Sequence, residues 1–296
     1  LTQSQAIRRH QSITTASAPD AWLTLSSLPK DHNSTLDNFA FTTDVEIRLF
    51  LPLALSKSGV YKSGRCNHCK ITLENGSQIG QPLQHGYHLI TGCKHVNQGK
   101  AAHRNIEGTI KAYFTKFSSA SARIVTKNLR GTNRKPDVLL SNLNGTDNKD
   151  VYLDVSTTNP YGKTNQTNSH RRGSQPSDNL VPCESHLTSA ATRETQKISK
   201  YRLLCAQLPV PSIFYPFVLE TTGGFGNSTK ATVALLAQNV RDSSDIDPKI
   251  VISMFKRDIA FALRRGTALQ LRVVNDAALD AIERDRLLLA DGHREL

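Results

Sequence analysis

The stretch Arg134–Asp154, RKPDVLLSNLNGTDNKDVYLD, decides the fold, because two short apolar runs in it are joined by a polar turn. The run VLL follows Asp137, and the run VYLDV surrounds Asp154. The Asn-Gly and Asp-Asn pairs between them are typical of hairpin turns, and Pro136 fits the start of a strand. The pattern therefore predicts a hairpin that brings Asp137 and Asp154 to one end of a small sheet.

The two carboxylates predict a metal site. Like charges that lie close together repel each other unless a cation lies between them. Carboxylate oxygens are the ligands that Mg²⁺ or Mn²⁺ prefers, and such a site hydrolyses phosphodiesters by activating water and neutralising the developing charge. Turn and edge aspartates without a metal are also common, so the hypothesis depends on the rest of the chain.

The positive charge of the chain is concentrated just before the acid pair. The net charge is +12 over 296 residues, and residues 61–136 contain thirteen Lys or Arg but only two Asp or Glu. This concentration favours a polyanion such as DNA or RNA as the partner, although solvated basic loops would give the same composition. The residues of this stretch that we expect to contact nucleic acid are Arg104, Lys111, Arg134 and Lys135.

The totals limit the class of protein. The length allows one large domain or two smaller ones, and Leu rather than Met at position 1 predicts a piece of a longer product. There is no run of about 18 apolar residues, and the N-terminus has no apolar core of a secretory signal, so we expect no membrane partner. Five cysteines, three of them within residues 66–93, do not form a disulfide framework and predict a reducing, intracellular compartment.

Residues 61–100 contain too few apolar side chains for a core, but they contain metal-ligand residue types. The pattern C-x2-C-x18-H-x4-C predicts a tetrahedral structural zinc site that replaces the missing core. Free thiols with incidental histidines are the alternative without a metal. Nearby histidines also stay open as ligands, namely His68, His85 and His95. The ligands that the spacing favours are Cys66, Cys69, His88 and Cys93.

The remaining periodicities predict helices and strands around the hairpin. We expect a helix over 39–53 capped by Thr43 or Asp44, a helix over 100–117 and a strand over 121–129. After a polar loop at 161–186, we expect a helix over 187–204 capped by Thr188 or Ser189, and a strand over 210–226. Helices over 230–240 and 248–274 follow, the second bent or broken near Gly266, and then a frayed end.

This order predicts an α/β fold, in which a mixed sheet has helices on both faces. The expected organisation is a helical connector at 1–60, a zinc knuckle at 61–100, a catalytic domain at 101–270 and a charged tail at 271–296. On the helix over 187–204, the side chains of Glu194, Lys197 and Tyr201 share one face, because their spacing is i, i+3 and i+7.

The motifs HRN, KPD, VYLDV, E-x2-K-x3-Y and FVLETTGG, in this order after the cysteine–histidine cluster, resemble a known region. It is the restriction-like endonuclease region at the C-terminus of non-LTR retrotransposon reverse transcriptase polyproteins. WLTLSSLP and FTTDVEIRLFLPL also look like the connector after the reverse transcriptase in those polyproteins. The resemblance covers residues 15–270, and it implies the PD-(D/E)xK fold, a structural Zn²⁺ and a catalytic Mg²⁺ or Mn²⁺.

The resemblance also implies a function and partners. In that family the endonuclease nicks one strand of target DNA, and the new 3′ end primes reverse transcription. The implied partners are target DNA, the RNA of the element and the reverse transcriptase domain of the same polyprotein, and the implied localisation is the nucleus. The alternatives are a catalytically inactive nucleic-acid-binding tail of a reverse transcriptase and a purely structural docking domain.

Individual roles follow from the resemblance. It implies Asp137 and Asp154 as ligands of the catalytic metal, and it implies the zinc ligands that the spacing favours. The usual catalytic lysine lies two residues after the second acid, where this chain has Ser156. The related endonucleases are thought to supply the lysine from the following helix, so the candidate is Lys197, or Lys200 in another register.

Two further acids have expected roles. Glu107 is the candidate for the additional acid that some nucleases of this fold carry on their first helix. Glu220 is expected to cap a strand end or to hold the turn formed by the glycines that follow it.

Overall fold

The computed structural model describes residue 21 and the ranges 36–48, 65–72, 76–82, 100–129, 131–147, 149–158, 187–210 and 212–292. In 65–72, 79–82 and 273–292 it describes the backbone only. The chain divides into two compact units. One contains Leu1–Thr35 and Ala102–Leu263, and the other contains Leu36–Ala101 and Arg264–Leu296.

The unit that contains residues 102–263 is built on a four-stranded mixed sheet. Its strands lie in the order β3 (Ser121–Ile124), β4 (Val138–Ser141), β5 (Asp150–Thr158) and β6 (Ser212–Glu220). The first three pair antiparallel, whereas β5 and β6 pair parallel. The predicted hairpin is confirmed as β4 and β5. The strands predicted at 121–129 and 210–226 are shorter, because the chain turns after Ile124 and again at Thr221.

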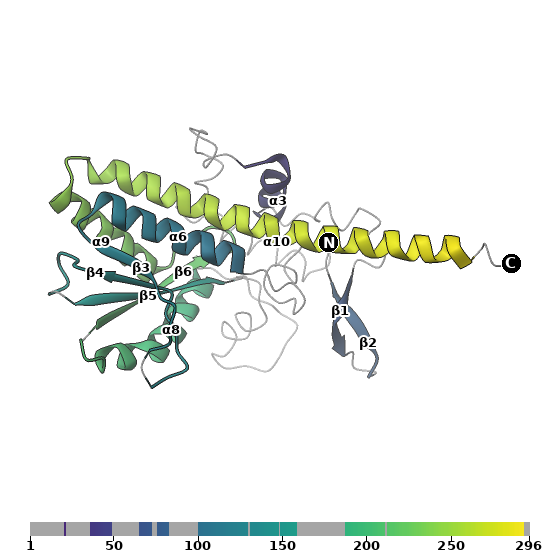
Figure 1. Ribbon diagram of the computed structural model, residues 1–296, viewed down its shortest axis with the longest axis horizontal. Coiled ribbons are helices and arrows are strands. Elements are labelled where there is room, and N and C mark those ends of the chain that lie inside the picture. The colour runs from purple at the N-terminus through teal and green to yellow at the C-terminus, as the bar shows by residue number, and fades with distance from the viewer. Residues whose placement is uncertain are drawn as a thin grey trace. The chain divides into compact units, whose positions relative to one another are not determined.

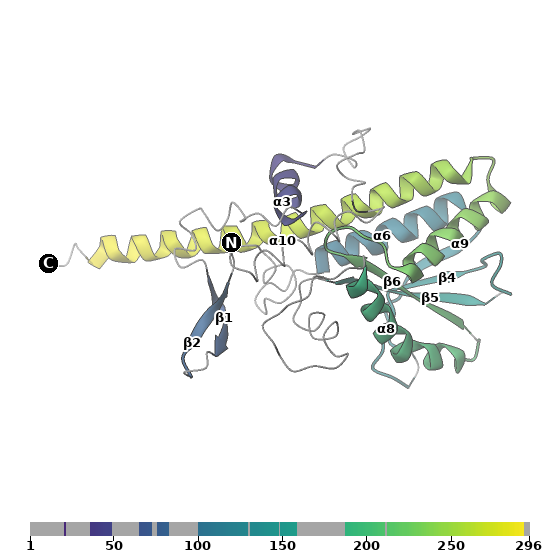
Figure 2. The same cartoon turned by 180° about the vertical axis from the view of Figure 1, so that it is seen from behind.

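Helices cover both faces of this sheet, so the α/β prediction is confirmed at the level of fold class. The helices α6 (Lys100–Phe117), α9 (Asn227–Ser243) and α10 (Pro248–Gly292) lie on one face, and α8 (Thr188–Ala206) lies on the other (Figures 1 and 2). Within the described residues, no helix is both long enough and apolar enough to span a membrane.

The side chains of β5 alternate between the main core and the face of the sheet that α8 covers. Val151, Leu153 and Val155 are buried in the main core, together with apolar residues of α6, α9 and α10. Because successive side chains of a strand point to opposite faces, Tyr152, Asp154 and Ser156 point toward α8. A smaller apolar cluster lies there, in which the ring of Tyr201 stacks on Phe214 with centroids 4.7 Å apart.

Helices α8 and α9 are both capped by carboxylates from other elements. The predicted cap of α8 by Thr188 or Ser189 is wrong, because the helix follows Leu187 in the left-handed conformation (φ 65°) without a side-chain cap. Instead, the Ala190 N–H donates to Glu220 Oε1 at 3.3 Å. Burial raises the pKa of Glu220 to about 7. The Ser228 N–H at the start of α9 donates to Glu194 Oε1 at 2.7 Å.

Glu220 also holds the turn that follows β6, as its sequence position predicted. Its N–H donates to the Gly224 carbonyl at 2.9 Å, and its own carbonyl accepts from the Gly223 N–H at 2.8 Å. The backbone of Glu220 therefore closes the turn, while its side chain caps α8.

The second unit contains α3 (Asn38–Arg48), the antiparallel hairpin of β1 (Arg65–Thr72) and β2 (Gln78–Pro82), and the C-terminal part of α10. The predicted cap of α3 at Thr43 or Asp44 is wrong, because Asp37 Oδ1 accepts from the Ala40 N–H at 2.7 Å. Asp44 is instead buried inside the helix and pairs with Arg48 at 3.0 Å and with Arg264 at 2.7 Å. The buried guanidinium groups explain why this acid lies within α3.

Helix α10 continues through Gly266 to Gly292, so the predicted break near Gly266 is wrong, and the described part of the predicted frayed end is helical. One glycine inside a helix costs only about 1 kcal/mol. The neighbours Leu263, Ala268 and Leu271 are buried and offset that cost.

The cap of α9 leads to a prediction about Gly226, the residue just before that helix. A Cβ at this position would collide with Glu194 Oε1 and would lie 3.2 Å from the Val218 carbonyl oxygen. We expect Gly226→Ala to lower the free energy of unfolding by about 1–3 kcal/mol, measured by denaturant titration.

Gly108 provides the matched control. It lies on the exposed side of α6, where a Cβ would meet nothing within 4 Å. Gly108→Ala should raise the free energy of unfolding by about 0.5–1 kcal/mol. Equal effects of the two substitutions would contradict the packing described for Gly226.

Candidate functional site

Asp137 is held rigidly at the start of β4. Its N–H donates to the Leu153 carbonyl at 2.8 Å, and its carbonyl accepts from the Val125 N–H at 2.8 Å. Its Oδ2 accepts from the Val155 N–H at 2.7 Å. One carboxylate oxygen is thus fixed by the neighbouring strand, and the other is available to a partner.

Asp154 is the cross-strand neighbour of Asp137. Val138 pairs with Leu153, and the same register continued by one residue places Asp137 opposite Asp154. Both acids therefore lie at the open end of the hairpin, although Asp154 does not end its strand, because β5 continues to Thr158. Both side chains are buried, Asp137 with 8% and Asp154 with 4% of its surface exposed.

Helix α6 supplies a third carboxylate and a histidine. His103 Nε2 lies 2.7 Å from Glu107 Oε1, one helical turn away, and 3.2 Å from Asp137 Oδ1. Burial lowers the pKa of His103, but the hydrogen bonds to Asp137 and Glu107 outweigh this effect and raise the pKa to about 9. The imidazole is therefore charged at neutral pH and joins two acids that would otherwise repel each other.

His103 was missed in the sequence, although a signal for it was present. Its spacing of i, i+4 to Glu107 places both residues on one face of a helix. Side-chain ligand atoms of His103, Glu107 and Asp137 all lie within 4.8 Å of one another, and Asp154 is outside that group. A donor set of one imidazole and two carboxylates fits a divalent transition metal such as Mn²⁺ better than Mg²⁺, provided that the imidazole loses its proton.

Helix α8 supplies a lysine to the other acid. The amine of Lys197 forms an ion pair with Asp154 Oδ2, and both side chains are buried. Glu194, which shares this face of α8 with Lys197, caps α9. Lys200 lies with its Nζ 4.8 Å from the centroid of the Tyr201 ring. Of the two candidate lysines, Lys197 is the one that contacts the acid pair.

Tyr201 completes the predicted face of α8. Its hydroxyl donates to the Lys135 carbonyl at 3.1 Å and thereby ties the helix to the segment before Asp137. Burial, followed by the negative charge of Asp154, raises the pKa of the Tyr201 hydroxyl, so the group stays neutral.

A second cation of α8 contacts Ser156, the residue at which the resemblance led us to expect a lysine. Ser156 occupies that position and is buried, and its hydroxyl accepts from Arg193 Nε at 3.0 Å. Arg193 precedes Lys197 by one helical turn, so both cations project from the same side of α8. The spacing of Arg193 and Lys197 shows in the sequence that they share a helix face, but their contacts with β5 depend on the fold.

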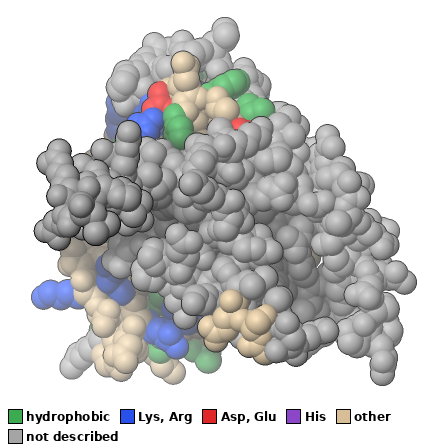
Figure 3. Space-filling model, turned by 90° about the vertical axis from the view of Figure 1, so that its right-hand side faces the viewer, with side chains coloured by type: hydrophobic (Ala, Val, Ile, Leu, Met, Phe, Trp, Pro, Cys, Tyr) green, Lys and Arg blue, Asp and Glu red, His purple; other side chains and the backbone are tan. Residues whose placement is uncertain are grey.

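The predicted nucleic-acid contacts are exposed. Arg104 and Lys111 lie on α6, and Arg134 and Lys135 lie just before Asp137 in the chain. Lys and Arg side chains also show among the described residues in the side view of Figure 3.

Most of the expected zinc site lies outside the described residues. Cys66, His68 and Cys69 belong to β1, where only the backbone is described. The other expected or alternative ligands, His85, His88, Cys93 and His95, and the polar segment 161–186 lie outside the described residues.

The His103 ion pairs lead to a prediction about pH and stability. Because the pKa of His103 is raised from 6.5 to about 9, its stabilising contribution is complete below pH 6.5 and is lost as the pH rises through about 9. His103→Gln should therefore lower the free energy of unfolding at pH 6 and have little effect near pH 10. Denaturant titrations of the unaltered and His103→Gln proteins across this pH range would measure the difference in their free energies of unfolding. A difference that does not change with pH would contradict the charged state of His103 in these ion pairs.

The sequence matches none of the protein-family models with which it was compared, and none of the curated proteins. Any function assigned to the site therefore depends on its residues and their geometry.

Proposed function

We propose that this chain contains a metal-dependent DNA endonuclease domain of the PD-(D/E)xK type, which nicks target DNA to prime reverse transcription by a non-LTR retroelement. The observation that carries the proposal is the ion pair between Lys197 of α8 and Asp154 of β5, beside Asp137. The motif lacks its strand lysine at Ser156, and a lysine from the next helix supplies the same charge to the same acid.

Each residue has a distinct role in this proposal. Asp137, with one oxygen fixed by Val155, and Asp154 would hold the metal, and Glu107 would assist from α6. A bound Mg²⁺ or Mn²⁺ supplies a nucleophilic water and neutralises charge on the phosphate. The Lys197 amine would orient that water or stabilise the additional negative charge of the attacked phosphodiester.

His103 would control access of the metal to the acids. In its charged form its Nε2 pairs with Glu107 Oε1 and Asp137 Oδ1, and it therefore competes with a metal for these two oxygens. Metal binding at these acids would require the imidazole to release its proton or to turn away.

The same cations favour a second candidate, a nucleic-acid-binding tail without catalysis. His103 and Lys197 already offset two of the three negative charges, so the fold depends less on a metal to offset the repulsion of the carboxylates. In this case the exposed Arg104, Lys111, Arg134 and Lys135 would retain their contacts with DNA or element RNA. Both candidates place the chain in the nucleus, next to the reverse transcriptase domain of its polyprotein.

The proposed zinc knuckle has a test of its own. Cysteine thiolates and one histidine at Cys66, Cys69, His88 and Cys93 suit tetrahedral Zn²⁺. Purified protein should contain one tightly bound zinc per chain by elemental analysis, and Cys66→Ser should remove it. The same zinc content in the Cys66→Ser protein would refute this ligand set.

Nicking of supercoiled plasmid separates the two candidates. With Mn²⁺ or Mg²⁺ present, we expect Asp137→Asn and Asp154→Asn to abolish nicking while DNA binding changes little. Lys197→Ala should lower the nicking rate about 10²-fold or more, as expected for the loss of one donor to the transition state.

Lys200→Ala is the matched control for Lys197→Ala. It removes a lysine of the same helix that lies over the Tyr201 ring, and the nicking rate should stay close to that of the unaltered protein. Undiminished nicking by Asp137→Asn would refute the endonuclease at this site. Binding without any nicking by the unaltered protein would favour the binding tail.

A further inference from the structure

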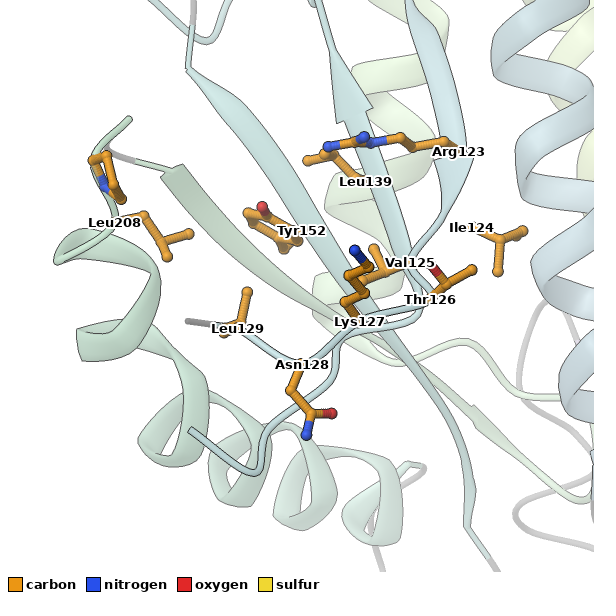
Figure 4. A pocket seen from close by; sticks show the side chains of 11 residues that line it. Arg123, Ile124, Val125, Thr126, Lys127, Asn128, Leu129, Leu139, Tyr152 and Leu208 are labelled. Atoms are coloured by element: carbon orange, nitrogen blue, oxygen red, sulfur yellow. The ribbon is translucent and has the colours of Figure 1, made fainter. Parts of the chain in front are cut away.

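A pocket lies on the α8 face of the sheet, beside the edge strand β3. Its volume is about 470 Å³, within the range of sites that hold small molecules. One row of residues crosses it from strand to strand, since Arg123 pairs with Leu139 and Leu139 pairs with Tyr152. Figure 4 shows Tyr152 between Leu208 on one side and Val125 and Lys127 on the other. Neither the acid pair nor the lysine of α8 lines this pocket.

The pocket is directly adjacent to the acid pair. Tyr152 and Asp154 are two residues apart on β5, so they point to the same face and lie about 7 Å apart along the strand. This distance is about the rise of two stacked nucleotides. A nucleic-acid strand whose phosphate reaches Asp154 can therefore place a nearby nucleotide against Tyr152.

The lining of the pocket combines an apolar floor with a basic rim. Leu129 and Leu139 are buried, and the Tyr152 ring is half-buried beside them. Arg123 and Lys127 are exposed at the rim. An aromatic ring stacks on a base of any type, and the cations attract the phosphates on either side of it.

We propose that this pocket binds one unpaired nucleotide, with its base on Tyr152 and its phosphate near Arg123 and Lys127. Bases of an intact duplex are stacked inside it and cannot reach such a pocket without being extruded. The substrate class is therefore DNA that has a single-stranded segment next to the nicked phosphate. This substrate assignment rests on the proposed endonuclease, whereas the binding of an unpaired nucleotide does not.

A peptide added to the edge of β3 is the competing occupant, since an edge strand offers unpaired backbone groups. The lining argues for the nucleotide. Leu139 and Tyr152 come from β4 and β5, so the pocket opens on the face of the sheet rather than along its edge. The two exposed cations also suit a phosphate.

Binding in the absence of cleavage tests the proposal. The full chain, with Ca²⁺ in place of Mg²⁺, is titrated into a fluorescein-labelled single-stranded 20-mer and into its duplex, and anisotropy is recorded. Tyr152→Leu should weaken single-strand binding about tenfold, since it removes one stacking ring, and change duplex binding less than twofold. Tyr152→Phe keeps the ring and should bind both DNAs as the unaltered protein does.

A charge variant gives a second readout that does not depend on the half-buried tyrosine. Lys127→Glu changes an exposed side chain and should weaken single-strand binding more than duplex binding. Lys249→Glu makes the same change at an exposed lysine of α10 and should affect both DNAs equally. If Tyr152→Leu does not fold, as judged by circular dichroism, the comparison of Lys127→Glu with Lys249→Glu tests the nucleotide pocket.

The outcomes separate this proposal from the endonuclease. Single-strand binding that Tyr152→Leu or Lys127→Glu leaves unchanged would overturn the nucleotide pocket, whatever the nicking assay shows, and would favour a peptide at β3. If these variants lose single-strand binding but the unaltered protein never nicks DNA, the nucleotide pocket is retained and the endonuclease is refuted.

Discussion

The repulsion among three buried carboxylates at one end of the sheet is the constraint on which the site depends. Glu107, Asp137 and Asp154 come from three different elements, and each is at least nine-tenths buried. Buried charges are stable only when they are paired. The protein supplies the counter-charges itself, with His103 between Glu107 and Asp137 and with Lys197 on Asp154. Two of the three negative charges are therefore balanced within the fold before any metal or phosphate arrives.

The position of α8 decides whether that balance is reached. Lys197 can meet Asp154 only if the helix lies at the correct height over β5, and three contacts fix this height. Glu220 of β6 accepts from the Ala190 N–H at one end, and the Tyr201 hydroxyl donates to the Lys135 carbonyl at the other. Glu194 of α8 in turn caps α9. The cation of the site is thus positioned by tertiary contacts between elements, whereas a lysine on β5 would be positioned by its own strand.

The sequence predicted the parts of this arrangement that local patterns encode. The hairpin, its two acids and the shared face of Glu194, Lys197 and Tyr201 follow from turn residues and from helical spacing. The caps of α8 and α9 could not be predicted in this way, because Glu220 and Glu194 reach them from other elements. His103 was missed since its second partner, Asp137, is distant in sequence. The continuity of α10 was missed because a lone glycine costs little in a helix whose neighbouring side chains are buried.

The cations beside Asp154 and Ser156 come from a helix and not from the strand that carries these two residues. A lysine on β5 would remain beside Asp154 whenever the sheet is folded. Here the cations at Asp154 and Ser156 are Lys197 and Arg193, and both belong to α8. A displacement of α8 would remove both charges together and break the ion pair of Asp154, which is unfavourable. Lys197, Arg193 and the Tyr201 contact should therefore be gained or lost as one unit, so that docking of α8 couples the stability of the fold to the chemistry of the acid pair.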